Sequence, residues 1–157
     1  MVTDVCFHET LIDSASEVFE TMMFMALEKV APEDAKIAED TMLSSITFTG
    51  ALEGCLAICC ASEDAKIIAA NMLGMEPEDD ISMEDICDAM GEVSNMVLGS
   101  VKKRIADAVG EITVSIPCTV SGKMLDTSLG ERTNMTEEFV DLDGTIVKFQ
   151  LFYKDNN

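Results

Sequence analysis

The chain has 157 residues, of which 48% are hydrophobic and 25% charged, a balance typical of one folded domain with a single core. Its formal net charge is -20, from 30 acidic and 10 basic residues, which disfavours binding to nucleic acid or to anionic lipid surfaces. The sequence has neither the basic and apolar pattern of a signal peptide nor an uncharged apolar stretch long enough to span a membrane. We therefore expect a single cytoplasmic domain over 1–157, with neither nucleic acid nor membrane as a partner.

Cysteine and histidine usage argues against metal chemistry and disulfides. His8 is the only histidine, so a His-rich metal site and a His-dependent catalytic triad are excluded. The cysteines show no CxxC spacing and most lie among apolar residues, which predicts reduced thiols in a core. They are Cys6, Cys55, Cys59, Cys60, Cys87 and Cys118.

The first half of the chain predicts a long helix, two strands and a short helix. Apolar residues recur every three or four positions over 9–29, which predicts an amphipathic helix that Pro32 ends. Over 41–62, alternation followed by a continuous apolar run from Cys55 to Ala61 predicts a close strand pair whose second member is buried on both faces. A short helix then begins with a cap at Ser62 and ends at Gly74.

A second long helix is expected over 82–108. Ser82 and Asp85 form a weak capping box, and Ile81 and Ile86 stand at the two positions of a hydrophobic staple. Basic residues near the C-terminal end, followed by Gly110, suit the helix dipole and a left-handed stop.

The remainder predicts strands. A strand is expected over 112–117, a loop over 121–134, and a hairpin around Asp143-Gly144 near the end of the chain. The whole pattern predicts an α+β fold in which long amphipathic helices pack on a largely antiparallel β-sheet.

The two long helices resemble each other in sequence. Asp13, Glu17 and Glu20 of the first helix match Asp88, Glu92 and Asn95 of the second in spacing, although Glu20 stands where the second copy has an amide. Because each helix precedes strands, we interpret the match as an internal duplication.

One face of the helix over 82–108 carries the candidate site. Helical periodicity groups Asp88, Glu92, Asn95 and Gly99 opposite an apolar face. Gly91 and Gly99 flank the carboxylate and the amide, although glycine disfavours a helix by about 1 kcal/mol relative to alanine. Small residues there would let another backbone approach closely, which indicates docking of a partner. A solvated face with two tolerated glycines is the alternative.

Asp88-x3-Glu92-x2-Asn95 resembles the D/S-x3-E-x2-N signature of the CheC, CheX and FliY family of chemotaxis phosphatases. The stretches ITFTGALEGCLAICCASEDAKIIAANMLG and ITVSIPCTVSG are similar to that family's strand pair with its following helix and to its later strand. CheX carries the motif once, on the second helix, so Glu20 in place of the first amide makes the chain most similar to CheX. The resemblance implies an internally duplicated CheC-like fold and a homodimer.

The family resemblance also implies a reaction, the removal of the phosphoryl group from the aspartate of a phosphorylated CheY-like response regulator. By this resemblance Asn95 orients the attacking water and Glu92 pairs with the regulator's lysine, while Asp88 meets a basic group or helps to position the helix. No cofactor of its own is expected, because the required Mg²⁺ should be held by the regulator.

Two other functions are compatible with the sequence. Related flagellar-switch domains act by protein contact alone, so a non-catalytic binding module for a receiver domain or switch component is the main alternative. A hydrolase for small phosphorylated metabolites is disfavoured, since the sequence has no Gly-rich phosphate loop and no metal motif.

Overall fold

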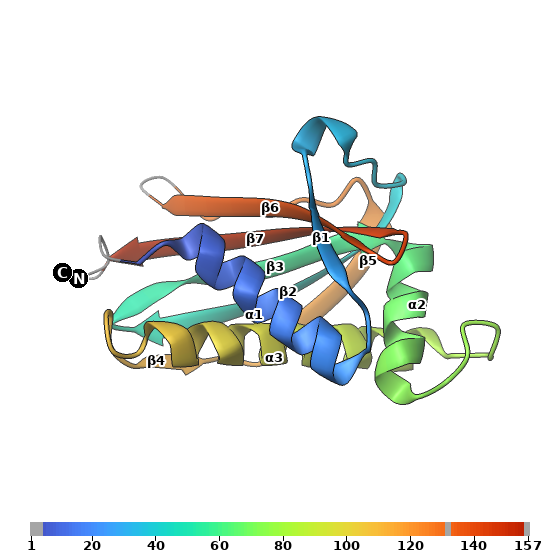
Figure 1. The fold of residues 1–157 in the computed structure, drawn as a ribbon, viewed down its shortest axis with the longest axis horizontal. Coiled ribbons are helices and arrows are strands. Elements are labelled where there is room, and N and C mark those ends of the chain that lie inside the picture. The colour runs from blue at the N-terminus through green and yellow to red at the C-terminus, as the bar shows by residue number, and fades with distance from the viewer. Residues whose placement is uncertain (1–4, 131–132, 156–157) are drawn as a thin grey trace.

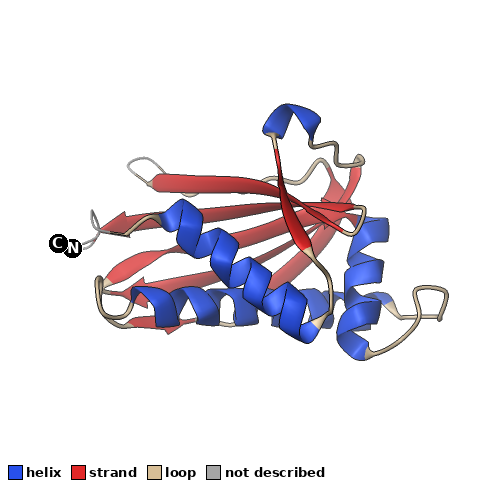
Figure 2. Ribbon diagram, in the orientation of Figure 1, coloured by secondary structure: helices blue, strands red, loops and turns tan. Residues whose placement is uncertain are grey.

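The computed structural model describes residues 5–130 and 133–155. Within these residues the α-helices are α1 (Phe7–Met22), α2 (Ser62–Leu73) and α3 (Met83–Ile105), and a 3-10 turn, η2, covers Pro32–Asp34. The strands are β1 (Leu27–Val30), β2 (Asp40–Gly50), β3 (Leu52–Ala61), β4 (Ile112–Val114), β5 (Cys118–Lys123), β6 (Asn134–Leu142) and β7 (Thr145–Asp155). The helices lie on one face of a single sheet (Figure 1, Figure 2). None of the described helices is both long and apolar enough to cross a membrane.

The sheet shows the internal duplication directly. Its strand order is β1-β6-β7-β3-β2-β4, with β5 also paired to β2, and every pairing is antiparallel. The first half of the duplication runs from α1 to β3 and the second from α3 to β7. The last strands of the two halves, β3 and β7, pair at the centre of the sheet, and β2 and β6 flank them. The strand that follows each long helix crosses to the far edge of the other half: β1 pairs with β6, and β4 and β5 pair with β2. The predicted α+β, internally duplicated architecture is confirmed.

The first helix is shorter than the predicted 9–29. Helix α1 ends at Met22, and the amides of Met23 and Met25 both donate to the Phe19 carbonyl. Phe24 between them has φ 55°, the left-handed conformation that stops a helix and that is normally left to glycine. Met25 is then buried at the turn into β1, so the later apolar residues belong to a strand rather than to a helix. Pro32 begins the turn η2 instead of ending α1.

The predicted loop over 121–134 is also too long. Strand β5 continues to Lys123 and pairs with β2 over Asp40–Ser45, and β6 begins at Asn134. The polar composition of β5 explains the error, because an edge strand with little buried surface shows no apolar alternation. Two residues of the predicted loop, 131 and 132, lie outside the described part of the chain.

Helix and turn signals were more accurate. Helix α3 begins after Ser82, whose hydroxyl accepts a hydrogen bond from the Asp85 amide at 3.1 Å. Gly74 ends α2 with φ 68°, and the β6–β7 hairpin turns at Asp143-Gly144, both with positive φ. Ser62 itself is the first residue of α2, and the N-cap, Ala61, makes no side-chain cap.

The core lies between the sheet and the helices, and β3 is its central strand. As predicted, β3 is buried along almost its whole length. Burial raises the pKa of the Cys60 thiol far above its usual range, and it also raises the pKa of Cys55. These thiols therefore stay protonated and act as small apolar side chains.

We predict that Gly54→Ala strongly destabilises the protein. A methyl group at Gly54 would lie 1.9 Å from the Phe152 carbonyl oxygen on the neighbouring strand β7 and 2.8 Å from the Phe48 ring. Because backbone cannot move aside in a central strand, the free energy of unfolding should fall by about 3 kcal/mol or more in urea denaturation. The control is Gly122→Ala in β5, where the three atoms nearest to the methyl group all belong to the flexible Leu125 side chain. A loss at Gly54 no larger than that of the control would contradict the tight packing of β3 against β7.

Candidate functional site

Helix α3 presents its two faces as the sequence predicted. Its buried side faces the core with Ile86, Met90, Val93, Val97 and Val101. Asp88, Glu92, Asn95 and Gly99 are exposed on the opposite side. Within the described residues, the side chains of Asp88, Glu92 and Asn95 make no hydrogen bond or ion pair, so all three are available to a partner.

A buried chain of hydroxyl groups fixes α3 to the sheet beneath these residues. Ser94, next to Asn95, donates to the Ser44 hydroxyl on β2 at 2.8 Å, and Thr119 on β5 donates to the same oxygen at 3.1 Å. The Ser44 hydroxyl also lies 3.2 Å from the Met90 carbonyl, to which it donates. Because Ser44 and Ser94 are fully buried, this hydroxyl chain sets the height and rotation of α3 over β2 and β5.

One flank of α3 faces the bend between β4 and β5. The Pro117 ring packs against Gly91, since a methyl group added at Gly91 would lie 3.3 Å from the Pro117 Cγ. Gly91 is buried, so the group that approaches it closely is the Pro117 ring of this chain. The interpretation that Gly91 directly receives a partner is therefore corrected, whereas Gly99 is exposed with nothing within 4 Å of an added methyl group.

The other flank of α3 faces α1. Arg104 pairs with Glu17 at 2.9 Å, and the Ser100 hydroxyl donates to the same carboxylate at 2.8 Å. Gly99 lies in a shallow groove between the two helices, with Met22 and Met96 on its walls. The groove extends the exposed face of α3 toward α1.

Two carboxylates of the motif copy on α1 are engaged in contacts within the molecule. Glu17, the match of Glu92, is held by Arg104 and Ser100, while Glu20, the match of Asn95, accepts a hydrogen bond from Ser16 at 3.1 Å. The two copies thus differ both in chemistry and in availability. The sequence shows the glutamate at position 20 directly. It has no signal for the pairing of Glu17 with Arg104, because that pairing depends on how α1 crosses α3.

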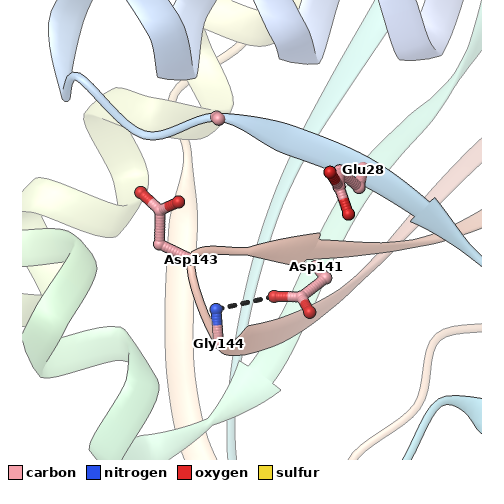
Figure 3. Close-up of a pocket in the computed structure, with 5 residues that line it drawn as sticks. Glu28, Asp141, Asp143 and Gly144 are labelled. Carbon is pink, nitrogen blue, oxygen red and sulfur yellow. Dashed lines mark hydrogen bonds between the residues drawn. The ribbon is translucent and has the colours of Figure 1, made fainter.

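An acidic hollow lies at the β6–β7 turn and is lined by Glu28, Asp141, Asp143 and residues beside them (Figure 3). Asp141 accepts a hydrogen bond from the Gly144 amide at 2.7 Å, so its carboxylate stabilises the hairpin turn. Among the described residues there is no group of three or more His, Cys, Asp or Glu side chains that could hold a metal ion. The position of the Asp141 carboxylate in the hollow is explained by its bond to the turn.

An internally duplicated α+β sheet with an exposed D-x3-E-x2-N motif on its second long helix defines a CheC-like protein. The family model described as chemotaxis phosphatase CheX matches residues 42–139, which is more than half of the chain and includes all of α3. The chain belongs to the CheX family of chemotaxis phosphatases, as the sequence resemblance indicated.

Solved structures share the fold over nearly the whole chain. Chemotaxis protein CheX from Vibrio vulnificus matches with a TM-score of 0.78 and 24% identity, covering 96% of this chain and 97% of that one. CheX from Borrelia burgdorferi, solved in a complex with CheY, BeF3 and Mg²⁺, matches with a TM-score of 0.77 and 19% identity, covering 96% and 99%. FliY from Thermotoga maritima matches with a TM-score of 0.64 and 18% identity, covering 92% and 86%. No curated protein matches the chain in sequence.

One feature of the site has almost no signal in the sequence. Ile116, in the bend that packs on Gly91, is 89% exposed beside the motif helix. Its only signal was an Ile-Pro pair at the end of a strand, which predicts a change of direction but gives no position relative to α3.

We predict that Ser44→Ala destabilises the protein because it removes the shared centre of the hydroxyl chain. The half-buried Thr119 hydroxyl would lose its acceptor and the buried Ser94 hydroxyl would keep only the Met90 carbonyl, at 3.2 Å, which should lower the free energy of unfolding by about 1–3 kcal/mol in urea denaturation. The matched control is Ser100→Ala, whose hydroxyl lies at the surface and whose loss should change the unfolding free energy by less than about 0.5 kcal/mol. Equal effects of the two changes would show that the hydroxyl chain contributes little.

Proposed function

We propose that this protein removes the phosphoryl group from the aspartyl phosphate of a CheY-like response regulator. The observation that carries the proposal is the pair of Glu92 and Asn95, exposed and without partners in the described structure, on a helix held rigidly over the sheet. Membership in the CheX family supports it. The complex of the Borrelia CheX with CheY, BeF3 and Mg²⁺ supports a regulator of the same kind as the partner here.

Asn95 would orient the attacking water. The water oxygen bonds to phosphorus while the bond from phosphorus to the aspartyl oxygen breaks, which releases inorganic phosphate and restores the carboxylate. Phosphoryl transfer through a loose transition state needs positioning more than proton abstraction, and a carboxamide can both accept from and donate to a water. Because Asn95 is neutral, it can approach the phosphoryl oxygens without repulsion.

Glu92 would pair with the lysine of the regulator's active site. It stands one helical turn before Asn95 on the same exposed face, so both side chains can enter one site together. The Mg²⁺ would be held by the regulator, and this chain would contribute no cofactor. The first helix would be silent, since Glu17 is held by Arg104 and Glu20 carries charge where an amide is needed.

A binding module without catalysis is the second candidate function. It is favoured by the open groove along Gly99, which is compatible with contact alone. Asn95 discriminates between the two functions, because docking does not require an amide in register with Glu92.

The proposal includes two properties of the protein in the cell. It would work in the cytoplasm with its thiols reduced, and it would form a homodimer through a sheet edge. The sheet ends at β1 on one side and at β4 and β5 on the other, and unpaired edges favour association.

We predict that Asn95→Ala and Glu92→Ala separate turnover from binding. Because Asn95 would act only in the reacting complex, Asn95→Ala should lower kcat by about 10² or more while binding of the regulator stays nearly unchanged. Truncating Glu92 removes one partner of an ion pair, which should weaken association by about 2–5 kcal/mol in addition to slowing turnover. The measurements are phosphate release at saturating phosphorylated regulator and binding to the regulator carrying BeF3.

The two variants also differ in their salt dependence. Loss of Glu92 should flatten the dependence of binding on ionic strength, whereas loss of Asn95 should not. Full turnover by Asn95→Ala would contradict the role of Asn95 in the reaction. Binding of the regulator by the unmodified protein without any phosphate release would favour the binding module.

We predict that Glu20→Ala leaves the rate of regulator dephosphorylation nearly unchanged, because the amide that the reaction needs is absent from α1. The rate should stay within about twofold of the original in the same phosphate-release assay. A tenfold loss, about 1.4 kcal/mol of transition-state stabilisation, would show that α1 takes part.

A further inference from the structure

A hollow of about 300 Å³ lies beside the motif, between α3 and the bend from β4 to β5. We call it the α3 notch and define it by its lining residues, which are Cys87, Asp88, Gly91, Ile116, Pro117 and Thr119. Asp88 belongs to the motif, so the notch is continuous with the face that carries Glu92 and Asn95. Gly91 stands one turn before Asn95, which sets the notch on the same flank of α3 as the amide.

The apolar wall of the notch is held in a fixed position. The Ser115 amide donates to the Thr47 carbonyl at 2.9 Å, and the two side-chain hydroxyl groups lie 2.7 Å apart. On the other side of Ile116, the Pro117 ring is seated on Gly91. Ile116 thus projects into solvent from a bend anchored at both ends, so that little chain entropy is lost when a partner covers it.

The opposite wall is acidic. Asp88 is exposed and has no ion pair or hydrogen bond within the described residues. An anionic group would be repelled there by Asp88 and by the net charge of -20, and a purely apolar group would bury the carboxylate without a partner. A lysine or arginine side chain is complementary to both walls, since its alkyl stem would pack on Ile116 and Pro117 while its charged head would reach Asp88.

We propose that the α3 notch binds a basic side chain of the response regulator, on the receiver-domain surface next to the phosphorylated aspartate. This inference rests on the proposed phosphatase function and adds to it a second cationic contact, distinct from the lysine assigned to Glu92. The notch selects among receiver domains, because only one with a basic residue at the matching place fills it.

The test uses the phosphorylated receiver domain that the wild-type protein dephosphorylates fastest among those of the same organism. Asp88→Asn and Ile116→Ser should each raise KM about tenfold and leave kcat within about twofold, because the notch holds the partner but does not touch the phosphoryl group. Asp88→Asn should flatten the salt dependence of KM, whereas Ile116→Ser should not. The conservative change Ile116→Val should keep KM close to the wild-type value. The double variant should lose less than the product of the single losses, since both walls contact one side chain.

Met124→Ser is the matched control. Met124 is 75% exposed and lies after β5, outside the residues that line the α3 notch, so this change should leave KM unaltered. Ile116 is also too exposed for its loss to unfold the protein, which a thermal melt of each variant checks.

The possible results distinguish failure of the notch proposal from failure of the proposed phosphatase function. Unchanged KM in both notch variants, with normal turnover by the wild type, overturns the notch and leaves the phosphatase function intact. A fall in kcat without a rise in KM for Asp88→Asn also overturns it, because Asp88 would then act on the reaction itself. Failure of the wild type to dephosphorylate any receiver domain overturns both proposals.

Discussion

Helix α3 lies on β2 through two kinds of contact, a row of buried apolar side chains and a chain of buried hydroxyl groups. The apolar row contributes most of the free energy that holds α3 on the sheet. It tolerates small rotations of the helix, because dispersion contacts are not directional. The hydroxyl chain through Ser44 is directional and joins α3 to both β2 and β5 at one oxygen. A rotation of α3 by one residue would bury Glu92 and break this chain at the same time. The exposed geometry of the motif therefore depends on a polar contact that lies directly under it.

The two halves of the duplication use their long helices differently. Both halves build the same unit, a long helix followed by strands that cross to the other half, yet only α3 carries a free motif. On α1 the equivalent carboxylate, Glu17, is used to hold the two helices together through Arg104. An exposed ion pair of this kind contributes little stability by itself, but it removes the carboxylate from any site. The first copy has thus become part of the support for the second.

How far the sequence predicts this structure depends on whether a signal is local. The start of α3 at Ser82, the turn at Asp143-Gly144 and the doubly buried β3 all follow from neighbouring residues, and all were found. The end of α1 was missed because Phe24 occupies a left-handed position usually given to glycine, and because the apolar period continues past it into β1. Strand β5 was missed since an edge strand needs no apolar alternation. The role of Gly91 could not be predicted, because the ring that covers it comes from Pro117, in a different part of the chain.

The two glycines of α3 show the same division between support and function. Gly91 is packed against the fold, since a methyl group there would lie 3.3 Å from the Pro117 ring, which would have to shift by a few tenths of an ångström. Gly99 meets nothing within 4 Å, so the fold alone would accept alanine and would gain about 1 kcal/mol of helix stability from it. Glycine at this exposed position, one turn after Asn95, costs the helix this stability, and under the proposed function it would let a partner's backbone pass close to α3. The same physical property, the absence of a side chain, thus serves internal packing on one flank of the motif and leaves open surface along the other.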